Sequence, residues 1–218
     1  EVRETLNFCF EPLRSERVTD LLSGTGNSMT SGCDAAVWAD GLDGLVFAGN
    51  DGTNGCELHL HRPGLNETAM ILNLHPNGDA MPGRDLGLHA INDGALVLFD
   101  ATDGANGRQL WVSDGTENGT RALGPVETVA PRPWADGLLF RSPTNDLLWT
   151  NGSDLRTWTT LPIWNTAQQQ AVTDNLSELN QFGQAWLHTN EHAVWFSASD
   201  TNGDVEPYRL DLGGTLTA

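Results

Sequence analysis

The chain has 218 residues, with 29 acidic and 11 basic side chains and a formal net charge of −18. Every basic side chain apart from histidine is an arginine, and this scarcity of positive charge argues against nucleic acid or an anionic membrane surface as a partner. The sequence contains no run of about twenty apolar residues, so no transmembrane helix is expected. The acidic composition favours a protein that stays soluble in a salty or extracellular medium.

Residues 1–33 lack the pattern that governs the rest of the chain. They combine a charged stretch at residues 11–18 with a flexible Ser/Gly-rich stretch at residues 23–28. Because propeller-like folds commonly close by pairing an N-terminal strand with the last blade, we interpret residues 1–33 as an N-terminal closing segment, with Leu6–Phe10 as the candidate strand.

Beyond this segment the sequence repeats itself. Residues 47–58 align with residues 99–110, a shift of 52 positions (Phe99 against Phe47), and the match continues without a gap through Thr68 and Thr120. Two weaker copies follow at residues 136–149 and 193–208. A fixed period near fifty residues is typical of a repeat architecture.

Each copy has an apolar run that ends in an aromatic residue, an Asp/Asn/Gly-rich turn, and a second apolar run. This order predicts a β-hairpin. The second run ends in Trp111, Trp149 or Tyr208, and the first copy has His59 instead. We expect the three aromatics to occupy equivalent buried places between sheets.

The sequence therefore predicts an all-β, propeller-like array of four-stranded antiparallel blades, because the repeat is long enough for about four strands. We expect a single domain over residues 1–218. Its repeats are placed near residues 34–85, 86–125, 126–165 and 181–218. Residues 166–180 are rich in Gln, Ala and Leu without Gly or Pro, which predicts a short helical insertion there.

The segment Gln109–Thr120 reads Gln-Leu-Trp-Val-Ser-Asp-Gly-Thr-Glu-Asn-Gly-Thr. It resembles the bacterial ELWVSDGT-type repeat, a family found in tandem on secreted and surface proteins and expected to form β-propellers. The resemblance is clearest over residues 93–120. It implies a fold and an extracellular or cell-surface location, with association with the surface or outer membrane. It implies no activity, because repeat folds host many functions.

The three cysteines are Cys9, Cys33 and Cys56, and no pair has the CxxC spacing of a structural zinc site. In an exported protein two of them are expected to form a disulfide. We favour Cys33–Cys56, because that bridge would pin the N-terminal segment to the first repeat, although the sequence alone leaves the other pairings open.

Two sets of histidines are candidate metal ligands. His89 and His188 occupy matching places before the turn that restarts the hairpin, and equivalent places in a cyclic repeat point toward one region. The alternative is that both rings face solvent near a channel mouth. His59 and His61 share one face of a strand and form the alternative metal pair. For His59 the competing interpretation is core packing, since it replaces the recurring aromatic.

Trp186 lies two residues before His188, and this Trp-x-His pattern resembles the copper-binding surface proteins of methane-oxidising bacteria. Those proteins bind Cu(I) through two histidines and a kynurenine derived from tryptophan. The resemblance implies copper as the cofactor, with Trp186, His188 and His89 as ligands. Imidazole pairs suit Cu(I), and Cu(II) heads the divalent affinity order.

Other motifs carry less. The spacing of His188, Glu191 and His192 matches that of some zinc peptidases, but it falls on a hairpin turn rather than the helix this chemistry requires. The acidic turns at residues 50–54 and 100–106 could supply oxygen ligands to calcium, yet Asp, Asn and Gly are ordinary turn residues.

From the histidine patterns and the two resemblances, we predict an exported, non-enzymatic copper-binding protein. The alternative is a surface module that binds a protein or glycan partner.

Overall fold

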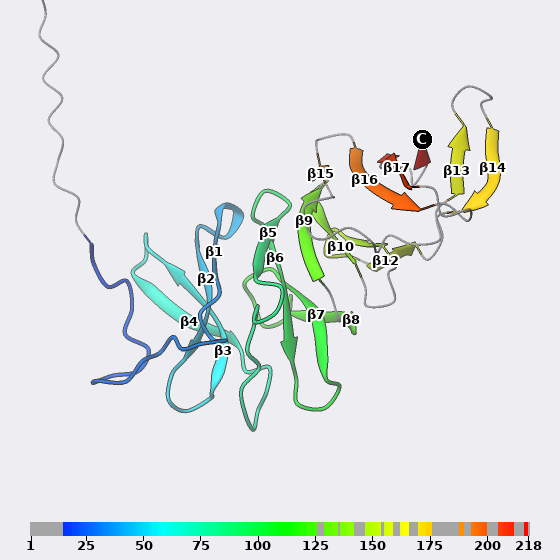
Figure 1. The fold of residues 1–218 in the computed structure, drawn as a ribbon. Helices are drawn as coiled ribbons and strands as arrows, with labels where there is room; N and C mark the ends of the chain where they lie inside the picture. Colours follow the sequence, from blue (N-terminus) through cyan, green and yellow to red (C-terminus); the bar gives the residue numbers. More distant parts are fainter. Residues whose placement is uncertain are drawn as a thin grey trace, which may run out of the picture.

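The computed structural model describes residues 15–125, 129–134, 136–141, 147–153, 155–158, 162–165, 170–175, 188–189, 193–199, 205–211 and 216–217. Within these ranges the regular elements are β-strands, apart from a single 3-10 turn at Asp40–Leu42. The strands form four sheets, and Figure 1 shows the sheets following one another along the chain. The all-β prediction is confirmed for this part of the chain.

The first three sheets are four-stranded and antiparallel, with strands in chain order. The first contains β1 (Ala36–Ala39), β2 (Gly44–Asn50), β3 (Cys56–Arg62) and β4 (Glu67–Leu72). The second contains β5 (Leu88–Ile91), β6 (Leu96–Thr102), β7 (Arg108–Ser113) and β8 (Arg121–Pro125). The third contains β9 (Val129–Trp134), β10 (Gly137–Arg141), β11 (Leu147–Thr150) and β12 (Leu155–Trp158). The prediction of four-stranded antiparallel sheets is confirmed for these three.

The last sheet departs from this plan because it has six strands in the order β14-β13-β18-β17-β16-β15. Its strands are β13 (Pro162–Asn165), β14 (Gln170–Asn175), β15 (His188–Thr189), β16 (Ala193–Ser199), β17 (Val205–Asp211) and β18 (Leu216–Thr217). Strand β13 joins β18 in parallel, whereas the other pairs are antiparallel. The prediction of four-stranded antiparallel blades throughout is therefore wrong for this sheet.

The predicted helical insertion over residues 166–180 is also wrong for the part that the structure describes. Residues Gln170–Asn175 form β14, which pairs antiparallel with β13. Composition favoured a helix here, but the β-branched Val172 and Thr173 suit an extended chain, and pairing with a neighbouring strand outweighs a weak helical preference.

The Asp/Asn/Gly turns that link β2 to β3 and β6 to β7 have the same internal hydrogen bonds. Asp51 Oδ1 accepts the backbone N–H groups of Thr53 and Asn54, at 2.8 Å each. Asp103 Oδ1 accepts the corresponding N–H groups two and three residues on, at 2.9 and 2.8 Å. In both turns the second carboxylate oxygen accepts the side-chain amide of the following Asn. The repeat in sequence is thus a repeat of turn chemistry.

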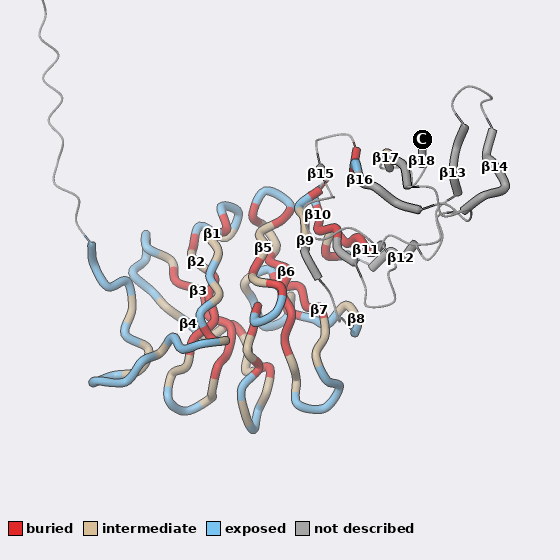
Figure 2. The backbone as a smooth tube through the Cα atoms, in the orientation of Figure 1, coloured by how far each residue is buried: buried red, intermediate tan, exposed pale blue. Residues whose placement is uncertain are grey.

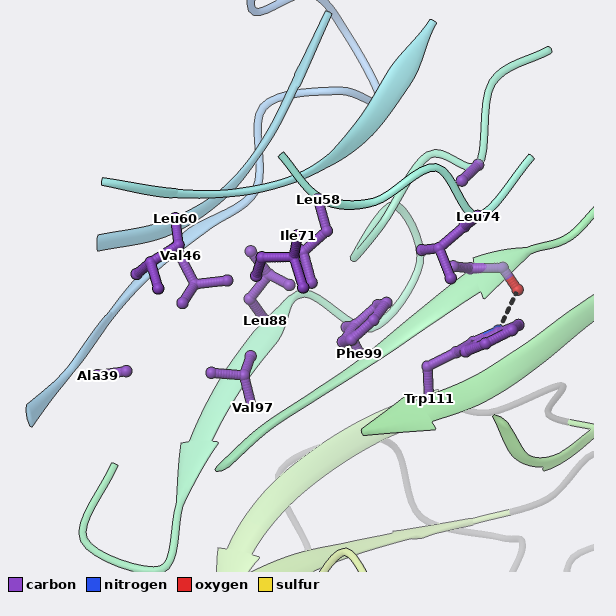
Figure 3. Packing of buried hydrophobic residues seen from close by; sticks show 12 residues of the cluster. Ala39, Val46, Leu58, Leu60, Ile71, Leu74, Leu88, Val97, Phe99 and Trp111 are labelled. Carbon is purple, nitrogen blue, oxygen red and sulfur yellow. Dashed lines mark hydrogen bonds between the residues drawn. The ribbon is translucent and has the colours of Figure 1, made fainter. Parts of the chain in front are cut away.

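Two apolar clusters pack successive sheets together. The cluster between the first and second sheets includes Phe99 and Trp111, and Figure 3 shows Leu58, Ile71 and Leu88 near Phe99. Trp111 Nε1 donates to the Ala101 carbonyl at 3.3 Å. A second cluster joins the second and third sheets. It contains Leu86, Ile91, Leu98, Leu110, Val112, Leu138 and Leu148. Figure 2 shows burial concentrated in the strands and exposure at the turns.

Strands of neighbouring sheets contact one another. Strand β1 contacts β5, β5 contacts β10, and β9 contacts β15. At one of these junctions Gly41 donates its backbone N–H to the Asp93 carbonyl at 3.1 Å, which joins the β1–β2 and β5–β6 turns. A propeller-like arrangement of these sheets, and its closure into a ring, remain predictions.

The expected equivalence of Trp111 and Trp149 is wrong by one residue. Thr150 Oγ1 accepts the backbone N–H two residues further on at 3.1 Å, and Ser113 Oγ does the same at 3.1 Å. Counting back from these matched positions places Leu148, not Trp149, where Trp111 stands. Trp149 therefore lies on the opposite face of its sheet, where its Nε1 donates to the Trp134 carbonyl at 3.0 Å. Phe140 pairs with Leu148 as Phe99 pairs with Trp111, and this closer spacing in the third copy hid the shift in the sequence.

The N-terminal segment is attached to the first sheet at described residues. Cys33 and Cys56 form a disulfide, which confirms the favoured pairing. Ser28 and Ala35 carbonyls accept backbone N–H groups from Asn50 and Ala48. Both cysteines are buried, so the bridge is shielded from solvent. Cys9 and the candidate strand Leu6–Phe10 lie outside the described residues.

Candidate metal-binding histidines

His89 lies on β5 and is half-buried. Its Nε2 lies 2.7 Å from the Leu86 carbonyl, and a carbonyl can only accept, so Nε2 carries the proton. In the neutral ring Nδ1 is then the nitrogen with a free lone pair, and any metal held by His89 would bind there.

His188 occupies the same register position in its sheet as His89 does in the second sheet. His89 pairs with Leu98, the residue before Phe99, and His188 pairs with Trp195, the residue before Phe196. Each histidine also lies on the first strand of its hairpin. This register match is a property of the backbone, and it is what a shared histidine site requires.

The remaining geometry of this predicted site lies outside the described residues. That applies to all of Trp186 and to the side chain of His188. The sheet that contains His89 and the sheet that contains His188 are separated along the chain by the third sheet, whose β10 contacts β5 and whose β9 contacts β15. The meeting of His89, His188 and Trp186 therefore stays a prediction.

His59 lies on β3 and is 1% exposed. Its ring stacks on Phe47, with ring centroids 5.5 Å apart and an interplanar angle of 27°. Its Nδ1 lies 3.0 Å from the carbonyl of Glu57, whereas its buried Nε2 has no hydrogen-bond partner. Burial lowers the pKa of His59, so the ring is held neutral. The core-packing interpretation is correct for the ring, but it leaves one nitrogen unexplained.

His61, two residues further on, takes part in closing a turn. Its Nδ1 lies 2.8 Å from Thr68 Oγ1. In the second sheet Ser113 Oγ lies 2.8 Å from Thr120 Oγ1, and these two residues are the 52-position equivalents of His61 and Thr68. The structure thus places His59 and His61 on one strand face. It also pairs His61 with Thr68 across the turn, as the second sheet pairs Ser113 with Thr120.

Met70 is the residue near this pair that sequence reasoning missed. It lies on β4 directly opposite His59 in the antiparallel ladder. Residues opposite each other in a ladder share a face, with Cβ atoms about 4.5–5.5 Å apart. The 52-position shift aligns Met70 with Ala122, so the position is part of the repeat. A β-bulge between Leu58 and His59 shifts the register, so the pairing of Met70 with His59 could not be predicted from the sequence.

A buried carboxylate lies at the start of the same strand. Glu57 is 0% exposed, and it accepts the backbone N–H groups of Leu74 at 2.8 Å and His75 at 3.2 Å. Burial raises the pKa of Glu57 to about 7, and these N–H donors oppose that rise because they favour the ionised form. Glu57 therefore holds the linker that leaves the first sheet and is sensitive to pH.

The acidic turns considered as calcium ligands have their oxygens engaged by the chain itself. Both carboxylate oxygens of Asp51 and of Asp103 accept hydrogen bonds from their own turns. These donors lower the pKa of both carboxyls, with the backbone N–H of Asn54 and of Asn106 as the largest cause. Turn formation explains why Asp51 and Asp103 are acidic. Calcium binding remains a proposal to which no set of ligands can be assigned.

Among the described residues no group of three or more His, Cys, Asp or Glu side chains is placed to hold a metal ion. A site built from described side chains must therefore be a pair of such residues or include another ligand type, such as methionine sulfur.

Within the same described part of the chain, no helix has the length and apolar character needed to cross a membrane.

No family model and no curated protein matches this chain. Among solved structures it is similar to TolB from Acinetobacter baumannii, with 13% sequence identity and a TM-score of 0.35. The match covers 79% of this chain and 42% of that chain, so this chain spans less than half of the length of TolB.

Proposed function

We propose that this is an exported, non-catalytic protein that binds copper through histidines. The observation that supports it is the register match of His89 and His188 on the first strands of their hairpins. The lone pair of His89 is on Nδ1, and a neutral imidazole is a ligand for both oxidation states of copper. Trp186, or a kynurenine made from it, is proposed as the third ligand.

Export is supported by the Cys33–Cys56 disulfide, because such bridges persist in oxidising compartments. The surface or outer-membrane association proposed from the repeat resemblance rests on the Gln109–Thr120 segment alone.

The test compares wild-type protein with His89→Ala and His188→Ala, each titrated with copper at equilibrium. Loss of about one bound ion per chain in both variants, with unchanged circular dichroism, supports the proposal. Because imidazole binds metal only when neutral, affinity should also fall below about pH 6. Copper stoichiometry that is unchanged in both variants contradicts the site.

The intact mass provides a second measurement. A kynurenine at Trp186 adds about 4 Da: dioxygen adds two oxygens across the indole ring, and hydrolysis then releases one carbon as formate, an oxidation that a nearby redox metal would promote. Peptide mapping would place the added mass. An unmodified Trp186 in protein isolated with its copper removes kynurenine from the ligand set but leaves the histidines to be tested separately.

A second candidate function is a surface module that binds a protein or glycan partner. The observation that favours it is the exposure of two tryptophans, Trp38 at 46% and Trp195 at 45%. Aromatic side chains with one wet face are enriched at recognition surfaces. Trp38→Ala would weaken binding to such a partner without changing copper binding, which separates the two functions.

A further inference from the structure

The His59 ring has a fixed protonation pattern that leaves one nitrogen available. Because the Glu57 carbonyl can only accept, the Nδ1 atom 3.0 Å away must donate. Nε2 of the neutral ring is then a bare lone pair, and it is buried without a partner. A buried acceptor without a partner is unfavourable, and binding a ligand there removes that penalty. Fixing Nδ1 on a backbone carbonyl is also how proteins orient a metal-binding imidazole.

Besides Glu57, whose carboxylate already accepts the backbone N–H groups of Leu74 and His75, two further side chains of metal-binding type share the face of His59. Met70 lies opposite it on β4, and His61 lies two residues along β3, so all three project from one side of the sheet. Two imidazoles and a thioether form a soft ligand set, and such ligands select Cu(I) over hard cations. Acidic side chains, which would favour calcium or magnesium, are not needed for this set.

These three residues depart from the repeat together. The second sheet has Trp111 where the first has His59, and the ladder sets Trp111 against Ala122 as it sets His59 against Met70. Ser113 stands where the first sheet has His61. The four-stranded sheet therefore forms without His59, His61 or Met70. At these three positions the first sheet has side chains that can coordinate a metal.

We propose that the face of the first sheet formed by His59, His61 and Met70 is a Cu(I) site, with Nε2 of His59 as its buried anchor. It is independent of the site proposed at His89 and His188. Leu21 from the N-terminal segment lies against Gly49 and Phe47 on this face. Because the His59 ring is only 1% exposed, an ion must displace part of its cover, so titrations must be equilibrated.

The test uses Cu(I) with ascorbate and a coloured competing chelator, on the full chain in a Cys9→Ser background so that no free thiol contributes. His59→Phe keeps a ring to stack on Phe47 and removes the nitrogen. Met70→Leu keeps the volume and removes the sulfur. His61→Ser restores the residue of the second repeat and its hydroxyl partner. We expect His59→Phe to remove about one ion per chain, and the other two to weaken binding at least about tenfold.

His75→Asn serves as the matched control, because His75 lies in the linker and should leave this site unchanged. X-ray absorption at the copper edge gives an independent readout: a sulfur neighbour in the background protein that is lost in Met70→Leu. Unchanged stoichiometry in His59→Phe, or an unchanged spectrum in Met70→Leu, overturns this site. Loss of copper in His188→Ala alone, with no change in His59→Phe, would uphold the proposed function and reject this inference.

Discussion

Ser113 and Thr120 close the β7–β8 turn through a 2.8 Å hydrogen bond between their hydroxyl groups. Ser113 also accepts the Gly115 N–H, and Thr120 donates to the Thr116 carbonyl at 2.6 Å. The polar side chains of the Ser-Asp-Gly-Thr segment therefore form one turn. Within it they hydrogen-bond to each other and to backbone groups that no neighbouring strand pairs.

Removing the Thr120 hydroxyl should destabilise the protein without affecting metal binding. Thr120→Val keeps the shape of the side chain but leaves its partners unpaired, and we expect a loss of about 1–2 kcal/mol in the free energy of unfolding. Glu117→Ala, at an exposed position in the same turn, should change it by no more than about 0.5 kcal/mol. Urea denaturation measures both, and equal effects would show that the hydroxyl pair contributes nothing specific.

Gly94 and Gly107 offer a matched pair for testing the contact between the first two sheets. Both have positive φ, 76° and 73°, so alanine is strained at either position. A Cβ on Gly94 would also overlap the backbone of Asp40, whereas Gly107 has open space around it. We expect Gly107→Ala to cost about 1 kcal/mol and Gly94→Ala about 3 kcal/mol, as measured by thermal unfolding. Equal costs would mean that the turns can separate without penalty.

The Cys33–Cys56 disulfide should contribute about 2–4 kcal/mol, since it closes a loop with a sequence separation of 23 residues. The double variant Cys33→Ala/Cys56→Ala should lose this amount in non-reducing denaturation. Thiol titration of the denatured, unreduced chain should find about one free thiol, from Cys9. Three reactive thiols in protein purified without reductant would contradict the bridge.

Glu57 should make stability fall as the pH rises. Its pKa is about 7 in the folded protein against 4.5 ordinarily, so the folded state binds the extra proton between these values. Unfolding free energy should therefore decline from about pH 4.5 to about pH 7, by at most about 3 kcal/mol from this group, and then level off. Glu57→Gln should flatten that decline. Parallel slopes for the two proteins in urea titrations at pH 5 and pH 8 would show that Glu57 is not the cause.

The hairpins could be predicted from the sequence because they depend on local turn chemistry. Asp51 and Asp103 stand at equal offsets, and the same side-chain acceptors form the same turns. The fourth sheet could not be predicted, because β13 joins β18 in parallel across more than fifty residues of sequence, and no local pattern encodes that pairing. Likewise, Trp149 stands one residue past the position equivalent to Trp111, and because side chains alternate along a strand this places it on the other face of its sheet.

The candidate metal ligands likewise include some that the sequence predicts and some that only the structure reveals. His59 and His61 share a strand face, which alternation along a strand predicts. Met70 could not be added from the sequence, because its position opposite His59 depends on a bulge in the ladder. The free nitrogen of His59 depends on which carbonyl its ring meets, and that is a property of the folded sheet alone.

The linker of residues 73–87 is held at its start by Glu57 of the first sheet and at its end by Asp100 of the second. Asp100 is buried, accepts the Leu86 N–H at 2.8 Å and pairs with Arg108. Each carboxylate thus belongs to one sheet and holds backbone from outside it. For anyone recombining these repeats, the linker is therefore not separable from either sheet. A chimera cut between Leu72 and Asn73 would leave Glu57 facing a foreign backbone, and one cut between Gly87 and Leu88 would do the same to Asp100.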